Sequence, residues 1–273
     1  MGLIKWLLAF RKPKKIKLGL ALGSGGAKGF AELGALKAFE EHGIEFSFIG
    51  GTSIGSIVGA FYADGYSATD ITQMLKGINL FEVMGGIPFG MDGLGFKKVV
   101  EREIGEKQIQ ELKKPFICVA TRASDGAEMM FNSGNVAERL CASSSFPPFF
   151  KSVIIDGESY IDGAFSNSIP ADHVKALGAD YVVGIDLSER ESKGGLVSKL
   201  MPSYKLGAKE PWEKGYANCN IVLRPDLSGY KATSFSKAEE MFDIGYNHAN
   251  CVIPQILEDI KNFKHKKKRK QKV

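Results

Sequence analysis

The stretch Gly51-Thr52-Ser53-Ile54-Gly55 places a serine where a strand must turn sharply into a helix. The apolar run 46–49 before it predicts a short strand, and the run 54–63 after it predicts a helix with one apolar face. Glycines flank the serine where a crowded backbone tolerates no Cβ, so the serine hydroxyl is held out at the end of the strand. Strand, turn and helix in this order are the context that a nucleophile elbow needs.

Strands and helices alternate around this stretch. A buried-strand run covers 16–22, a glycine-rich turn covers 23–29, and a helix is predicted over 30–41. Such alternation indicates an α/β fold with a mainly parallel sheet covered by helices. No internal repeat or convincing linker is found, which favours one domain.

Further strands and helices are predicted in the rest of the chain, together with two segments of less regular sequence. Two of them lack a clear period: 85–95 predicts a loop that is either a flap or a connection, and 188–216 predicts either an inserted mobile loop or a covering segment. The other predicted elements are hairpins at 116–131 and 152–161, helices at 68–77, 136–144, 170–177 and 236–261, and a strand at 181–185.

Charge is distributed unevenly along the 273 residues. Residues 1–17 carry six Lys or Arg and no acid, and residues 261–273 carry eight and no acid. Without these fourteen bases the chain holds 22 bases against 31 acids, a formal charge of −9. We therefore expect a basic, apolar leader (1–17), an acidic globular domain (18–260) and a basic tail (261–273).

The leader has the composition of an interfacial anchor. Its apolar run 3–10 is far shorter than the roughly 20 residues that span a bilayer, and bases follow it, unlike in a signal peptide. Trp6 also stands where a myristoylation motif needs Ser or Thr. We expect Trp6 and the leucines to enter the headgroup region while the lysines meet anionic lipid. The alternative is that both ends are simply solvated. The composition of the C-terminal tail is equally compatible with binding lipid, with binding nucleic acid and with a solubilising role.

The four cysteines are scattered, with no metal-ligand spacing. Small buried residues in a reducing compartment are the expected interpretation. We therefore expect a cytoplasmic protein with peripheral membrane contact, and neither a metal nor another cofactor.

A serine nucleophile needs a base and donors aimed at the developing oxyanion. The glycine loop 23–29 joins a strand to a helix, so the backbone N–H groups of Gly25, Gly26 and Ala27 are expected at a helix N-terminus, where anionic charge is favoured. Lys28 adds a cation nearby.

Two other interpretations of the glycine loop are disfavoured. A Walker loop needs Ser or Thr after Lys28, where Gly29 stands. A dinucleotide fingerprint that starts at Ser24 lacks its first glycine, and no acidic residue near position 48 is placed to bind a ribose. A plain tight turn remains an alternative.

Asp162 is the candidate base because it ends a short strand. An Asp-Gly pair usually marks only a turn, as expected at Asp125 and Asp156. The chain order also permits a rival, because Ser53, Asp162 and then His173 or His248 follow the order of an α/β-hydrolase triad.

Three ordered motifs resemble those of the patatin-like phospholipase family. Residues 24–29 are similar to the family's oxyanion loop and residues 51–55 to its nucleophile elbow. Residues 142–147 and 160–164, with Asn167, Pro170 and 177–180, are similar to the stretch that carries the family's aspartate. The resemblance runs from Leu18 to Asp186. Ser24 replaces the first loop glycine, and Ala164 replaces the more frequent second glycine after the aspartate.

The resemblance implies a three-layer α/β/α fold and a Ser53–Asp162 dyad without a histidine. It implies a lipid acyl hydrolase (phospholipase, lysophospholipase or esterase) that forms an acyl-enzyme and takes phospholipid or another lipid ester, with no nucleic-acid partner. The oligomeric state stays open. A Ser-His-Asp esterase or thioesterase, and a catalytically silent membrane-associated regulatory module, are the alternatives. The residues that support the motifs are Ser24, Lys28, Gly29, Gly51, Gly55, Gly163 and Ala164.

Overall fold

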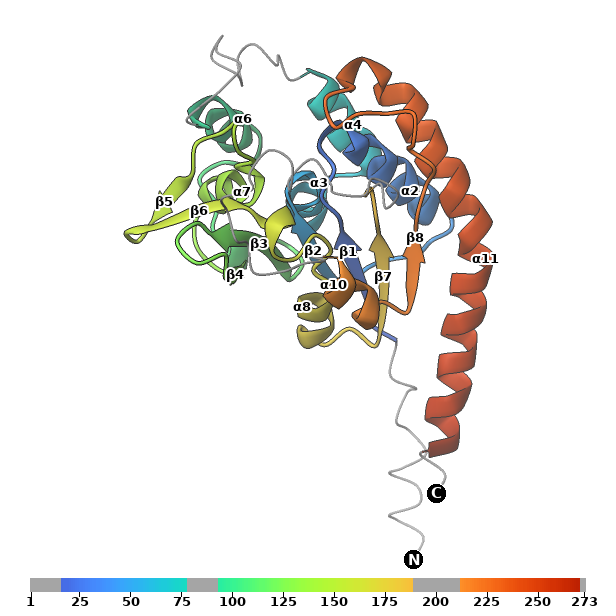
Figure 1. The fold of residues 1–273 in the computed structure, drawn as a ribbon. Coiled ribbons are helices and arrows are strands. Elements are labelled where there is room, and N and C mark those ends of the chain that lie inside the picture. Colours follow the sequence, from blue (N-terminus) through green and yellow to red (C-terminus); the bar gives the residue numbers. More distant parts are fainter. Residues whose placement is uncertain (1–15, 78–92, 189–211, 271–273) are drawn as a thin grey trace, which may run out of the picture.

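A mainly parallel sheet forms the centre of the molecule and carries helices on both faces (Figure 1). The computed structural model describes residues 16–77, 93–188 and 212–270. The strands are β1 (Leu18–Leu22), β2 (Phe48–Thr52), β3 (Phe116–Arg122), β4 (Glu128–Phe131), β5 (Val153–Ile155), β6 (Glu158–Asp162), β7 (Tyr181–Ile185) and β8 (Ile221–Leu223).

The strand order is β5-β6-β3-β2-β1-β7-β8, and β4 also pairs with β3. The five strands from β3 to β8 run parallel, whereas β4, β5 and β6 are joined by antiparallel pairing. Every residue of β1, β2 and β7 is buried, as expected for parallel strands with both faces covered. The prediction of an α/β fold with a mainly parallel sheet is confirmed.

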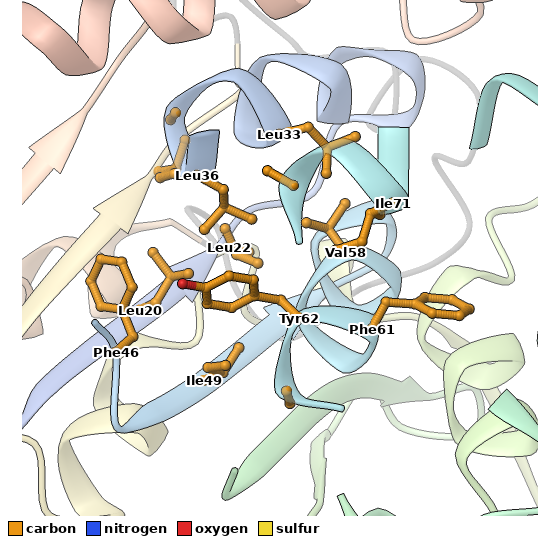
Figure 2. Close-up of a cluster of buried hydrophobic side chains, with 14 of the residues drawn as sticks. Leu20, Leu22, Leu33, Leu36, Phe46, Ile49, Val58, Phe61, Tyr62 and Ile71 are labelled. Carbon is orange, nitrogen blue, oxygen red and sulfur yellow. The ribbon is translucent and has the colours of Figure 1, made fainter. Parts of the chain in front are cut away.

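The larger core lies between the sheet and the helices of one face. Figure 2 shows Leu20, Leu22 and Ile49 of the sheet beneath Leu33 and Leu36 of one helix and Val58 of another. A smaller core under α8 covers the opposite face. The helices are α2 (Gly29–Glu41), α3 (Ile54–Ala63), α4 (Ala68–Gly77), α6 (Leu94–Ile104), α7 (Val136–Ser144), α8 (Ala171–Ala176), α10 (Glu213–Asn218) and α11 (Ala238–Lys270).

Most predicted elements are present with nearly the predicted bounds. The helices expected at 54–63 and 136–144 are confirmed without a shift, and both expected hairpins are present with strand ends that differ by one residue. At the start of α4, the Ser67 N–H donates to Asp70 Oδ2 at 3.0 Å and the Asp70 N–H donates to Ser67 Oγ at 3.1 Å, which is a capping box with Asp in place of Glu.

Four differences separate the sequence predictions from the structure. Strand β2 starts two residues later than 46–49 and continues through Thr52, because Phe46 instead packs against Phe39. Helices α6 and α10 begin within the segments 85–95 and 188–216, where no helix was predicted, and most of those segments lie outside the described residues. Strand β8 was not predicted, and α11 continues past position 261, where the basic tail was expected to begin.

Helices α2 and α11 approach each other at backbone contact. A Cβ added to Gly34 would lie 2.0 Å from the Phe242 carbonyl oxygen, and one added to Gly245 would lie 1.9 Å from the Ala31 carbonyl oxygen. Because both neighbours are backbone atoms, no side-chain rotation can relieve the clash. The two glycines therefore fix how closely α11 covers α2. In the described part of the chain, no helix has both the length and the apolar composition to cross a bilayer.

We expect Gly245→Ala to lower the free energy of unfolding by about 1–3 kcal/mol through overpacking. Helix propensity alone would make the alanine variant more stable by about 1 kcal/mol. A net loss of stability must therefore come from the clash with α2. The measurement is urea denaturation followed by circular dichroism. Gly77→Ala is the control, since no atom lies within 4 Å of its added Cβ. If Gly245→Ala and Gly77→Ala had equal urea midpoints, the close packing of α11 on α2 would be contradicted.

Candidate active site

Ser53 joins β2 to α3 in a backbone conformation that is unusual for any residue except glycine. Its φ is 56° and its ψ is −124°. The surroundings enforce this turn, because a Cβ on Gly51 would lie 2.1 Å from the Gly55 carbonyl oxygen, and a Cβ on Gly55 would lie 2.6 Å from the Gly23 carbonyl oxygen. The sharp strand-to-helix turn that the sequence predicted is therefore present, and Gly51 and Gly55 are needed because neither position has room for a Cβ.

The Ser53 hydroxyl donates a hydrogen bond to Asp162, 109 residues away along the chain. The distance from Ser53 Oγ to Asp162 Oδ2 is 2.6 Å. Sheet register creates this contact, since Thr52 pairs with Val119 in β3, and the next β3 residue, Ala120, pairs with Asp162 in β6. The Ser53 residue is 9% exposed and Asp162 is 1% exposed, so the pair is almost withdrawn from water.

Asp162 is held through both its side chain and its backbone. Its Oδ1 accepts a hydrogen bond from the Ala164 N–H at 2.8 Å, and its carbonyl oxygen accepts one from Thr121 Oγ1 at 2.9 Å. A Cβ on Gly163 would lie 2.2 Å from the Val119 carbonyl oxygen, so the residue after Asp162 must be glycine. These contacts leave the Asp162 carboxyl one orientation, towards Ser53.

Burial raises the pKa of Asp162 to about 7, although the hydrogen bonds from Ser53 and from the Ala164 N–H both lower it. An ordinary aspartate is a weak proton acceptor, whereas a carboxylate with a pKa near neutrality is suited to general base work. The geometry and the raised pKa thus both favour Asp162 as a general base for Ser53.

A second serine, Ser143, forms hydrogen bonds that hold the backbone of Ser53. The Ser53 N–H donates to Ser143 Oγ at 3.0 Å, and Ser143 Oγ donates to the Val119 carbonyl oxygen at 2.6 Å. Ser143 lies in the serine-rich run that carries the family resemblance, but no sequence pattern predicted this particular contact. Since it occupies the Ser53 N–H, that amide is not an available oxyanion donor in this conformation.

The glycine loop packs directly on the elbow. A Cβ on Gly29 would lie 2.3 Å from Ile54 Cγ1, and Gly26 has a φ of 57°, which favours glycine. Within the described residues, the N–H groups of Gly25 and Gly26 have no hydrogen-bond acceptor, whereas the Ala27 N–H donates to the Ala232 carbonyl oxygen at 2.7 Å. Two of the three expected donor amides are therefore available, and the third is engaged.

A buried carboxyl fixes the start of this loop. Glu32 of α2 accepts a hydrogen bond from the Gly23 N–H at 2.7 Å through Oε1. Burial raises the pKa of Glu32 well above its ordinary value, the Gly23 hydrogen bond lowers it, and the nearby Asp186 raises it further. The sequence pattern did not single out Glu32, which lies among the otherwise apolar buried residues of α2.

A polar network lies beside the aspartate loop. The Asn167 amide nitrogen donates to Glu128 Oε1 at 3.1 Å and to Asp172 Oδ1 at 2.9 Å, and His173 contacts Glu128 through Nε2. The Lys214 ammonium lies 3.0 Å from Glu128 Oε2 and 2.7 Å from Asp172 Oδ2. Glu128, Asp172 and His173 have ligand types that could hold a metal ion, but the Lys214 ammonium already supplies the cation to both carboxylates.

Burial raises the pKa of Glu128, but hydrogen bonds from His173, Asn167 and Lys214 outweigh it, and the pKa falls to about 2. Asn167 also connects this network to the site. Its carbonyl oxygen accepts from Thr52 Oγ1 at 2.8 Å and its N–H donates to the Gly163 carbonyl oxygen at 2.9 Å. Asn167 thus joins the elbow strand, the aspartate loop and the network.

The two histidines considered for a triad, His173 and His248, have other partners. His173 contacts Glu128, and His248 Nε2 accepts a hydrogen bond from the Arg224 N–H at 3.0 Å. His42 contacts the Ala38 carbonyl oxygen through Nδ1 at 2.9 Å. The side chain of His265 lies outside the described part of the structure. Among the described residues, the partner of the Ser53 hydroxyl is a carboxylate.

Comparisons with known proteins identify the proteins to which this chain is similar. The sequence model of the family described as patatin-like phospholipase matches residues 20–175. Patatin-like phospholipase domain-containing protein 6 of Homo sapiens is 27% identical over 277 residues, which cover 86% of this chain and 20% of that protein. Lysophospholipase nte1 of Aspergillus fumigatus is 27% identical over 286 residues, which cover 90% of this chain and 18% of that protein.

Among solved structures, VipD from Legionella pneumophila is similar, with a TM-score of 0.58 at 12% identity, over 88% of this chain and 67% of that chain. At this identity the similarity bears on the fold alone. The chain spans about a fifth of the length of the curated relatives that it matches.

We expect Asn167→Ala to lower the free energy of unfolding by about 2–4 kcal/mol, because it leaves a cavity and removes the amide donor from two carboxylates. Urea denaturation measures the change. Asn132→Ala is the control, since Asn132 is exposed in the turn after β4. If the two variants unfolded at the same urea concentration, Asn167 would not be the connection described here.

Proposed function

Because the chain belongs to the patatin-like phospholipase family, we propose that it is a serine acyl hydrolase that cleaves phospholipid, lysophospholipid or related lipid esters. The observation that carries this proposal is the 2.6 Å hydrogen bond from Ser53 Oγ to Asp162 at a nucleophile elbow. The names of the curated relatives support a phospholipid or lysophospholipid substrate. Since the chain corresponds to only part of those relatives, the substrate class is a proposal.

In the proposed acylation, Ser53 Oγ attacks the ester carbonyl carbon and its proton passes to Asp162 Oδ2. The tetrahedral intermediate collapses, the bond to the alcohol breaks, and the leaving alcohol takes the proton from Asp162. In deacylation, Asp162 accepts a proton from water as the water oxygen attacks the acyl-enzyme. The Ser53 oxygen then leaves with that proton and the fatty acid is released.

The Gly25 and Gly26 N–H groups are the proposed oxyanion donors. They lie at the N-terminal end of the 3-10 turn Gly26–Lys28 that leads into α2, where backbone amides favour negative charge. Ala27 could add its amide only if the Ala232 carbonyl moved away. Lys28, the last residue of this turn, is buried.

Direct activation of Ser53 by Asp162 fits the structure better than either alternative. A Ser-His-Asp triad would require His173 or His248 to leave its present partner and Asp162 to release Ser53. A catalytically silent module would not require the raised pKa of Asp162 or the strained elbow. We also propose that the globular domain 18–260 carries the activity, and that the basic leader contacts membranes peripherally.

We expect Ser53→Ala and Asp162→Asn each to lower kcat/KM for lysophospholipid roughly 1,000-fold or more, because each removes one half of the reacting pair. The measurement is fatty-acid release, with fluorophosphonate labelling of the protein as a second readout. His173→Gln and His248→Gln test the triad and are expected to keep most of the activity. If a folded histidine variant lost activity as completely as Ser53→Ala, the dyad would be wrong.

The rate of hydrolysis should increase with pH, as expected when an ionised carboxylate acts as the base. Only the ionised Asp162 can accept the Ser53 proton, and burial raises its pKa to about 7. We therefore expect kcat/KM to rise about tenfold per pH unit below about pH 7 and to level off above it. The measurement uses a short soluble ester, with circular dichroism at each pH to show that the protein stays folded. A profile that is flat through pH 7 would contradict a base with this pKa.

A further inference from the structure

The candidate active site and the basic end of α11 lie towards opposite edges of the parallel sheet. Ser53 follows the last residue of β2 and so lies at the carboxyl edge. Leu18 and Tyr181, the paired first residues of β1 and β7, mark the amino edge. Five residues of strand separate the two edges by roughly 15 Å.

Helix α11 reaches the amino edge and continues beyond it. The Tyr181 hydroxyl donates to Asp259 Oδ2 at 2.8 Å, and the Tyr181 and Phe263 ring centroids are 6.2 Å apart. The helix then runs through Lys270, and seven further residues add roughly 10 Å of helix. Figure 1 shows this end of α11 extending past the sheet, on the side away from the points of β7 and β8.

The projecting turns are basic at every position. Residues 264–270 read Lys-His-Lys-Lys-Lys-Arg-Lys, so each position of this helical segment is Lys, Arg or His. One or two cations would suffice to complement the helix dipole, and six Lys or Arg exceed that need. The leader joins the fold at the same edge, where the Lys17 N–H donates to Asp180 Oδ2 at 3.1 Å.

We propose that this basic end of α11, residues 261–270, is a docking surface for an anionic phospholipid membrane. Its charge is opposite to that of the acidic body, so an anionic surface is attracted here and repelled elsewhere. The choice of lipid over nucleic acid rests on the proposed function, because a lipid acyl hydrolase meets bilayers, and on the apolar composition of leader residues 3–10. Docking in this way leaves Ser53 facing away from the bound membrane.

The orientation has a functional consequence. A membrane bound at the amino edge concentrates the protein without placing the catalytic pair in that same bilayer surface. Hydrolysis of a monomeric ester should therefore not depend on docking. Lipid substrate would reach Ser53 as a monomer or from a second membrane.

The test is co-sedimentation of the full chain with phosphatidylcholine vesicles that contain or lack phosphatidylglycerol. The variant replaces Lys266, Lys267 and Lys268 by Gln. The matched control replaces Lys98, Lys113 and Lys151, three exposed lysines elsewhere on the molecule, by Gln and loses the same charge. Both are compared again with residues 1–10 deleted, so that the leader cannot mask the result.

We expect the wild-type chain to bind only the anionic vesicles, and to bind less as salt increases. The helix variant should bind at least tenfold more weakly, while the control variant binds like the wild type. Both variants should hydrolyse a short soluble ester at the wild-type rate, with or without vesicles.

Three results would overturn this docking surface: no binding to anionic vesicles, equal losses in the helix and control variants, or tighter binding of duplex DNA or RNA through the same three lysines. Repeating the binding with Ser53→Ala separates this proposal from the proposed function. Ser53→Ala should dock like the wild type, and a wild-type chain that docked through α11 but hydrolysed no lipid ester would contradict the proposed function and leave the docking surface intact.

Discussion

The close approach of three backbone segments around Ser53 is the constraint on which the rest of the site depends. The end of β1, the end of β2 and the first turn of α3 meet so tightly that Gly51 and Gly55 have no room for a Cβ. Within this contact Ser53 is held at a positive φ, and its carbonyl accepts hydrogen bonds from the Ser56 N–H and hydroxyl at 2.9 and 2.6 Å. The strain of this turn is opposed by the packing of the whole parallel sheet.

Burial of Asp162 links stability to chemistry. An ionised carboxylate that is only 1% exposed is unfavourable, and the chain supports it with few hydrogen bonds. A fully satisfied aspartate would keep an ordinary pKa and be a weaker base. Burial of the Asp162 carboxyl is thus the physical origin of the basicity that the proposed mechanism uses.

The polar network around Glu128 differs from Asp162 in that its carboxylates are paired with a cation. Around Glu128 the carboxylates are neutralised by Lys214 and bound by Asn167 and His173, so the pKa of Glu128 falls to about 2. Two carboxyl groups of one sheet region, Glu128 and Asp162, therefore have pKa values pushed in opposite directions by their partners. One is suited to holding the loop through Asn167, and the other to exchanging a proton with Ser53.

Much of the architecture could be predicted from local sequence. The buried apolar runs of β1 and β7, the glycines at 51 and 55 and the capping box at Ser67 each determine nearby backbone within a few residues. The amphipathic α6, rich in charge and preceded by glycines, was missed because its stability comes from packing against α7, a contact that no local pattern records. Strand β8, only three residues long, was missed for the same reason, since its order depends on pairing with β7.

The sequence by itself determined the elbow, the glycine loop and the α/β alternation, because these follow from the steric needs of single residues and from hydrophobic period. Only the tertiary structure decided that Asp162 reaches Ser53, that Ala27 is engaged by Ala232, and that Asn167 ties the loop to Thr52. These contacts join residues 109, 205 and 115 positions apart. They are set by sheet register and by the burial that shifts the pKa of Asp162, and both are properties of the folded chain as a whole.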